Sequence, residues 1–177
     1  MSAKAAPQSL PGIAVLEQTP IILEKILLSA GEEEFLWKPA ADRWSIREVL
    51  AHLADTELHV FRGRVEKMMK ESNPALASHD QNEAYARGEY SKGSGRENLK
   101  IFCHGRDRSL SILRYLAPES LGRTGRHEKL GIITIGNLMN EWAFHDLGHI
   151  RQIAELFRSK VFYPNAGPFQ RFYTIRP

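Results

Sequence analysis

The sequence predicts an all-α protein: a four-helix bundle with a long crossover loop and an irregular C-terminal tail. Its 177 residues, of which 42% are hydrophobic, are enough to bury one core. Four stretches place apolar residues at helical spacing, and segments rich in Gly, Pro, Ser and Asn separate them. We therefore expect one domain over residues 1–177, with its core at about 10–158 and a tail, residues 159–177, that lies on the bundle as a strap.

The first predicted helix extends from Thr19 to Ala30. Thr19 is suited to the N-cap, Pro20 to the first helical position, and Gly31 to the stop. The preceding residues, 10–17, are expected to add no more than an earlier turn or two.

Three further helices follow from periodicity and capping signals. The second spans Ser45 to about Lys70 and opens with a capping box of Ser45 and Glu48. The third covers residues 97–116, and the fourth begins after Thr134 and continues to about residue 157. Between the second and third lies the crossover, residues 71–95, a length that is uncommon for a loop and often functional. Residues 129–134 are expected to be extended.

Composition excludes several classes of protein. The single Cys103 permits neither an intramolecular disulfide nor a multi-cysteine metal site, and we expect it to be a small buried hydrophobe. Since no apolar run approaches about 20 residues, we expect no membrane span. The 24 basic and 21 acidic residues are interspersed, which argues against a nucleic-acid partner. With no secretory signal recognisable at the N-terminus, we predict a cytoplasmic protein.

Two histidines in the fourth helix suggest a metal site. At about 100° per residue, one stripe holds these residues: Leu138, Trp142, His145, His149, Ile153 and Leu156. Histidines four residues apart lie one turn apart, so that both imidazoles can reach one ion. The alternative is that carboxylates or backbone groups satisfy both rings in an ordinary core.

A third ligand would come from the second helix. His52 lies beside its apolar face, and His59, seven residues later, is a second candidate that is more typical of a surface position. We expect His79, His104 and His127 to be solvated. Three histidines around a metal would leave a coordination position open for water or substrate, as in catalytic sites.

Three sequence blocks resemble the DinB-like superfamily, in its DinB/YfiT-type branch of metal-dependent enzymes. They are residues 37–39 (WKP), 44–55 (WSIREVLAHLAD) and 140–153 (NEWAFHDLGHIRQI), and the likeness extends over residues 16–153. The resemblance implies a four-helix bundle, often a homodimer, with a divalent metal, frequently nickel or zinc. It places the metal ligands at His52, His145 and His149. It also implies, for some relatives, thiol S-transfer with a low-molecular-weight thiol co-substrate.

The leading functional hypothesis is therefore a transferase that acts on a small-molecule substrate through a metal-activated thiol, because a coordinating thiol is deprotonated. Asp55 and Glu141, each close to a histidine along its helix, are candidates for fixing imidazole tautomers, and Gln152 for binding substrate. Any of three arginines would suit a substrate carboxylate: Arg47, Arg151 and Arg171.

Two other hypotheses stay open. The first is metal-dependent hydrolysis of a small molecule, in which Asp146 of the segment His145–His149 takes the place of the general-base Glu in the HExxH motif. The second is a bundle that binds metal without catalysis.

Overall fold

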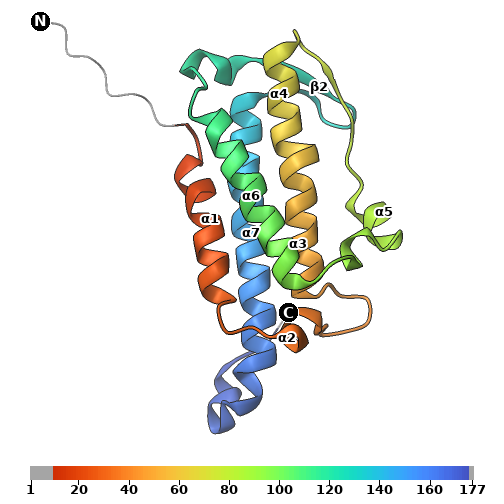
Figure 1. Cartoon of the computed structure of the whole chain (residues 1–177), viewed down its shortest axis with the longest axis vertical. Coiled ribbons are helices and arrows are strands. Elements are labelled where there is room, and N and C mark those ends of the chain that lie inside the picture. Colours follow the sequence, from red (N-terminus) through yellow and green to blue (C-terminus); the bar gives the residue numbers. More distant parts are fainter. Residues whose placement is uncertain (1–9, 176–177) are drawn as a thin grey trace, which may run out of the picture.

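Four long helical segments form the bundle in the computed structural model, which describes residues 10–175 (Figure 1). They are α1 (Ile13–Ile26), the continuous rod of α3 (Ile46–Asp55), η1 (Thr56–Arg62) and α4 (Gly63–Lys70), then α6 (Gly95–Leu113) and α7 (Ile135–Val161). Shorter elements are α2 (Glu32–Leu36), α5 (Gln81–Ala86), η2 (Glu89–Ser91), η3 (Pro118–Gly122), η4 (Tyr163–Asn165) and η5 (Gly167–Phe172). The prediction of a helical bundle is confirmed.

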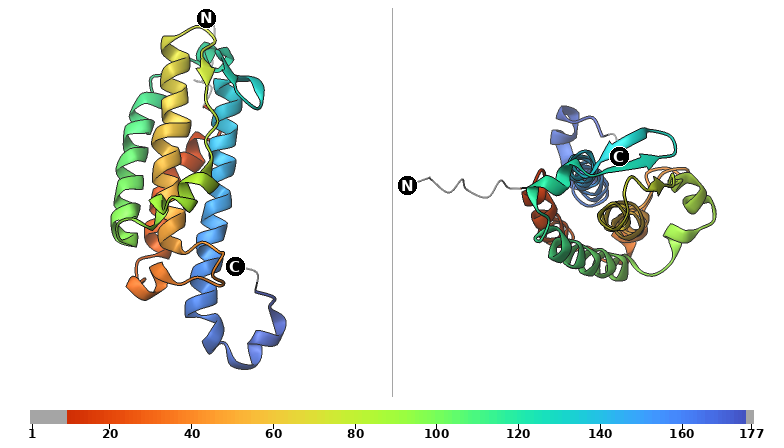
Figure 2. Two further views of the ribbon diagram at one scale, coloured as in Figure 1. Left: turned by 90° about the vertical axis from the view of Figure 1, so that its right-hand side faces the viewer. Right: turned by 90° about the horizontal axis from the view of Figure 1, so that it is seen from above.

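The order of the helices around the bundle explains the crossover. α1 packs on α6 and α7, and α3 packs on the same two helices, so that α1 and α3 occupy opposite corners. α1 and α7 run in one direction while α3 and α6 run in the other (Figure 1). The chain must therefore return along the whole bundle between α4 and α6, and it does so over the face between α4 and α7 (Figure 2).

The N-terminal boundary of α1 differs from the prediction. The helix begins at Ile13, and Pro20 lies in its interior rather than at its first turn. A proline there removes the hydrogen bond to the carbonyl four residues earlier, which belongs to Leu16. The Arg106 side chain supplies the missing donor, with Nη1 2.9 Å from Leu16 O. Thr19 is no N-cap, and its hydroxyl donates to Val15 O.

The second predicted helix is continuous over the expected residues but contains a π-helical segment. Ser45 caps it together with Glu48, as predicted. The π segment, η1, widens the turn over Thr56–Arg62, which changes the residues that face inward. As a result both Glu57 and Arg62 are buried, although neither belongs to the apolar stripe.

The boundaries of the last two long helices are close to those predicted. α6 begins two residues early, at Gly95, after the N-cap Ser94. A Cβ on Gly95 would lie 2.1 Å from the Phe35 ring, so only glycine fits this contact. α7 starts after its N-cap Thr134, as expected, and continues one turn further, to Val161.

A small sheet, which was not predicted, covers one end of the bundle. Strand β1 (Ala75–Leu76) pairs in parallel with β2 (Thr124–His127), and β2 pairs in antiparallel fashion with β3 (Gly131–Thr134). All of β3 lies in the stretch expected to be extended, residues 129–134. The crossover is thus well organised, because it contains β1, α5 and η2.

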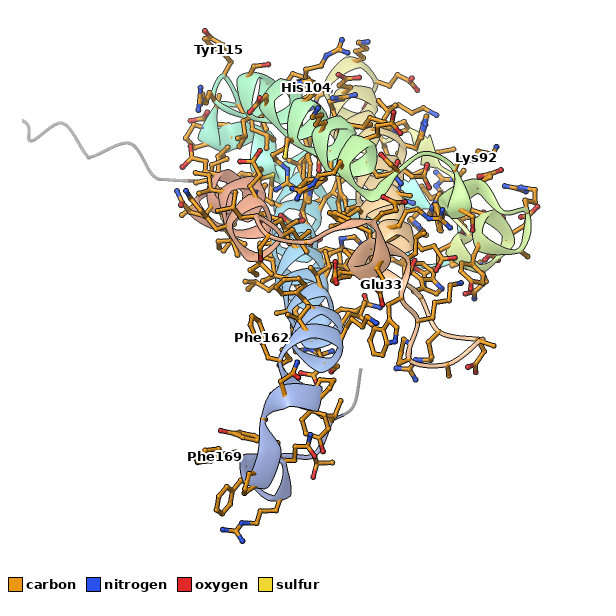
Figure 3. All side chains as sticks on the ribbon, turned by 60° about the horizontal axis from the view of Figure 1, so that its bottom comes forward. Glu33, Lys92, His104, Tyr115, Phe162 and Phe169 are labelled. Carbon is orange, nitrogen blue, oxygen red and sulfur yellow. The ribbon has the colours of Figure 1, made fainter. Side chains whose placement is uncertain are left out.

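The C-terminal tail does not lie along the bundle as a strap. Its two 3₁₀ turns, η4 and η5, project beyond the end of the bundle, and Figure 3 shows Phe162 and Phe169 there. Four of its aromatic side chains are more than half exposed: Phe162, Phe169, Phe172 and Tyr173. Within residues 10–175, no helix has the length and apolar character needed to cross a membrane.

Candidate metal site

Three histidines from two helices meet between α3 and α7. His52 comes from α3 and is only 2% exposed, while His145 and His149 lie one turn apart on α7 and are half-buried. One ring nitrogen of each lies within 4.8 Å of the others. The two Nε2 atoms of His52 and His145 are 3.1 Å apart. The structure therefore brings together the three residues that the sequence selected.

Aromatic rings enclose this cluster. The Trp44 ring stands edge-on to His52 at 5.2 Å between centroids, and the Phe61 ring stands edge-on to His145 at 5.1 Å. Trp44 precedes the N-cap of α3, whereas Phe61 belongs to the π segment η1. These rings therefore cover one side of each of the two imidazoles.

Burial keeps the three histidines neutral. Desolvation, followed by the neighbouring imidazoles, lowers the pKa of His52 to about 2 and, with Arg106 also contributing, that of His145 to about 3. Desolvation also lowers the pKa of His149. A neutral imidazole is the form that binds metals, so the site is ready for a cation near neutral pH.

Tyr90 connects His52 to Asp55. The Tyr90 hydroxyl donates to Asp55 Oδ2 at 2.9 Å and lies 3.3 Å from His52 Nδ1. Since its proton is given to Asp55, the hydroxyl oxygen accepts from His52 Nδ1–H. Asp55 thus acts on the imidazole through Tyr90 rather than directly. His79, which we expected to be solvated, is half-buried and pairs with Asp55 at 3.0 Å.

Gln152 holds the second imidazole. Its Oε1 lies 2.8 Å from His149 Nδ1, one turn along α7, and accepts the proton of that nitrogen. We expected Gln152 to bind substrate. In the structure it instead orients an imidazole, which is the role expected of Asp55 and Glu141. Glu141 is exposed, and the buried His145 Nδ1 has no hydrogen-bond partner within the described residues.

The donor set fits a divalent cation. With Nδ1 of His52 and His149 protonated, the Nε2 atoms of both rings carry the free lone pairs. His52 Nε2 faces His145 Nε2 at hydrogen-bond distance. A third neutral imidazole completes the ligand number of a catalytic zinc-type site.

Asp146 belongs to a buried ion cluster instead of the reaction site. Arg106 binds its carboxylate in bidentate fashion, at 2.6 and 3.0 Å, and binds Glu57 with its other side. The Trp142 indole also donates to Glu57, at 3.1 Å. Because both of its oxygens are engaged, Asp146 is not available as the general base that the HExxH comparison suggested.

The remaining candidates lie outside the cluster. His59 and His104 are exposed as expected, whereas His127 is buried and accepts hydrogen bonds from the backbone of the β2–β3 turn. Cys103 is half-buried, and burial raises the pKa of its thiol to about 11, which agrees with a packing role. Among the arginines, Arg47 is half-buried, while Arg151 and Arg171 are exposed.

Two cavities border the histidines, and His145 lines both of them. One, of about 600 Å³, is lined by His52 and His145 and extends toward the β2–β3 turn. The other, of about 450 Å³, is lined by His145 and His149 and extends toward Trp44 and Arg151. A ligand in either cavity would lie beside the imidazoles.

Comparison with known proteins agrees with this geometry. The model of the DinB superfamily matches residues 16–153. The "Putative metal-dependent hydrolase OB0782" of Oceanobacillus iheyensis is 26% identical over 145 residues, which cover 82% of this chain and 83% of the relative. The "Putative metal-dependent hydrolase YfiT" of Bacillus subtilis is 29% identical over 150 residues, 82% of each chain.

A solved structure shares the fold. It is described as "YfiT from Bacillus subtilis is a probable metal-dependent hydrolase with an unusual four-helix bundle topology". It superposes with a TM-score of 0.76 at 22% identity and covers 90% of this chain and 94% of that one. The family model spans most of the bundle, including all three clustered histidines. This chain is therefore a member of the DinB superfamily.

Proposed function

We propose that the chain is a metal-dependent enzyme in which His52, His145 and His149 hold one divalent cation, nickel, zinc or a similar ion, through Nε2. The observation that carries the proposal is the 3.1 Å approach of His52 Nε2 to His145 Nε2 beside a third imidazole. Two such lone pairs repel each other unless a proton or a cation lies between them. Burial keeps both rings neutral, and without a cation the neutral His145 can donate its Nε2 proton to His52 Nε2. A cation would take the place of that proton when His145 carries its proton on Nδ1 instead.

A cation bound here would lower the pKa of a coordinated water or thiol. The chain itself orients the site: Tyr90 and Gln152 fix two imidazole tautomers, and the rings of Trp44 and Phe61 pack against His52 and His145. Glu141 lines both cavities beside His145 and is the carboxylate available to exchange a proton with a ligand there.

We favour thiol S-transfer, in which a low-molecular-weight thiol attacks an electrophilic small molecule. The arrangement of acids supports this choice: Asp146, next to His145 in the chain, is bound to Arg106 and is not free to act as a general base. A coordinated thiol is deprotonated without one. Hydrolysis of a small molecule is the second candidate, supported by the names of the two curated relatives and by the position of Glu141.

The test combines metal, thiol and electrophile. Purified protein without a His-tag is loaded with Ni²⁺, Zn²⁺ or Mn²⁺, its metal content is measured, and it is assayed with glutathione and monochlorobimane or with 4-nitrophenyl acetate alone. We expect one metal per chain and conjugation that needs both metal and thiol. His145→Ala should lose both, whereas His59→Ala, an exposed histidine in the same rod, should keep both.

Each other outcome has a definite meaning. Ester cleavage without thiol would replace transfer by hydrolysis, and bound metal with neither reaction would indicate a non-catalytic bundle. A protein that binds no metal, or a His145→Ala variant that retains the full metal content, would refute the three-histidine site.

We also propose that the enzyme is a cytoplasmic homodimer without a nucleic-acid partner. The exposed aromatic side chains of the tail, among them Phe162 and Phe169, support self-association because apolar patches of this kind mark interfaces. Interspersed charges argue against a nucleic-acid partner. Light scattering should give twice the chain mass of 20.1 kDa, and a monomer at micromolar concentration would contradict the dimer.

A further inference from the structure

The cavity of about 600 Å³ beside His52 and His145 is also lined by residues further along the rod. On one wall it is lined by His52, Thr56, Val60 and Arg64, spaced four residues apart along the rod. Arg64 follows His52 by twelve residues, which places it about three turns further along the rod. The opposite wall contains Asn137, Glu141 and His145 of α7, again one turn apart. The cavity therefore connects the cluster to the sheet end of the bundle.

Arg64 lies at this far end without a negative partner. Its side chain is half-buried, and its Nη2 donates to the backbone carbonyl of Ala77 at 2.9 Å. Among the ion pairs formed within residues 10–175, none includes Arg64. Burial lowers the pKa of Arg64, and guanidinium groups stay charged in proteins. A half-buried, unpaired guanidinium beside a cavity favours an anion.

A second basic group lines the same end. Lys129, in the β2–β3 turn, is exposed and borders the cavity, as does the buried His127. Burial, together with Arg64, lowers the pKa of His127 and so disfavours its charged form. Among the residues that line the cavity, the fixed charges are Arg64 and Lys129 against Glu141. Asp80 and Glu128, outside the lining, lie close enough to Lys129 to interact with its charge, so Arg64 is the cation of this end with no negative partner among the described ion pairs.

Apolar side chains also line the cavity. They are Val60, Phe61, Leu130, Ile133 and Leu138. A ligand that fills this part must have an apolar body, and a cavity of about 600 Å³ has the size of ordinary small-molecule sites.

We propose that this cavity binds the substrate as a small amphipathic carboxylate, with its carboxylate on Arg64 and Lys129 and its apolar body along Val60 and Leu138. The reactive group at the other end of the molecule then reaches His52 and His145. The placement of the reactive group at the histidines rests on the proposed function. The binding of the carboxylate at Arg64 does not need the metal.

The test compares two probes of the same shape, 4-phenylbutanoate and the neutral 4-phenylbutanamide. Their dissociation constants are measured by calorimetry on the metal-free full chain, at low and at high salt. We expect the carboxylate to bind about tenfold more tightly than the amide, as a charge-assisted hydrogen bond provides. Arg64→Gln should remove this preference, and Lys129→Gln should reduce it, with a smaller preference at high salt.

Arg151→Gln is the matched control, because Arg151 borders the other cavity beside His145. It should keep the preference. Lys129 is exposed in a turn, so its variant tests the inference even if Arg64→Gln unfolds. The inference is overturned if the amide binds as well as the carboxylate, if Arg64→Gln and Lys129→Gln both retain the full preference, or if Arg151→Gln abolishes it.

A separate zinc titration distinguishes the two proposals. A protein that prefers the carboxylate but binds no zinc supports the anion site and refutes the three-histidine metal site. A protein that binds zinc without any preference for the carboxylate refutes the anion site alone.

Discussion

Replacing Arg106 by Met tests whether one buried cation holds the bundle together. Arg106 is fully buried and donates to three partners on different helical segments: Glu57 of η1, Asp146 of α7 and the Leu16 carbonyl of α1. Methionine retains much of the apolar volume but supplies no donor. The variant therefore leaves two buried carboxylates and one carbonyl without their partner.

The expected cost follows from these contacts. Removal of one partner of a buried ion pair costs about 3–5 kcal/mol. An unsatisfied buried carbonyl adds about 1–3 kcal/mol, and the Leu16 carbonyl has no helical donor because Pro20 lacks an N–H. The sum, about 4–8 kcal/mol, is comparable with the entire unfolding free energy of a typical domain. Arg106→Met should therefore be largely unfolded at 37 °C.

Urea denaturation followed by circular dichroism at pH 7 measures this cost. The matched control is the triple variant Arg106→Met, Glu57→Gln, Asp146→Asn, in which the two carboxylates are neutral as well. Since neutral replacement of a whole buried ion cluster is often tolerated, the triple variant should recover several kcal/mol relative to Arg106→Met. A loss below 1 kcal/mol for Arg106→Met, or no recovery in the triple variant, would refute the reasoning.

Three further predictions concern the site and the packing. Tyr90→Phe removes the acceptor of the His52 Nδ1 proton and should weaken zinc affinity about tenfold or more in a competition titration, while unchanged affinity would deny Tyr90 an orienting role. The pKa values of about 2 for His52 and about 3 for His145 lie below the unfolded value near 6.5, so the unfolded chain binds more protons. Each ring should thus lower the unfolding free energy of the metal-free protein by about 2 kcal/mol when the pH falls from 7 to 5. Urea midpoints that stay constant as the pH is lowered would contradict this. Gly95→Ala places a methyl group against the Phe35 ring and should lower the unfolding free energy by about 1–3 kcal/mol, whereas an unchanged urea midpoint would show that the ring moves without cost.

Local signals in the sequence were enough to predict the four helices. Ser45 with Glu48 and Thr134 with its helix are capping patterns that act within four residues, so they need no tertiary information. The spacing of His145 and His149 on an apolar stripe likewise determines that both rings face the core. The placement of His52 beside them came from the family resemblance, because helical spacing alone also allowed His59.

Other features depend on residues far apart in the sequence. From the sequence alone, Pro20 predicts the start of a helix. In the structure it lies inside α1, because Arg106, 86 positions later, donates to the Leu16 carbonyl that Pro20 leaves without a donor. The same holds for Tyr90, which lies in the crossover and reaches His52 only because the chain returns along the bundle.

The sequence by itself therefore determined the helices, their inward faces and the pair of histidines on α7, since these follow from backbone hydrogen bonding and periodicity within a few residues. Only the tertiary structure decided the π segment, the sheet, the partners of each imidazole and the unpaired Arg64 at the end of the cavity. The physical reason is that burial and hydrogen-bond satisfaction are properties of the packed chain. A buried donor or acceptor must find its partner wherever the fold brings one.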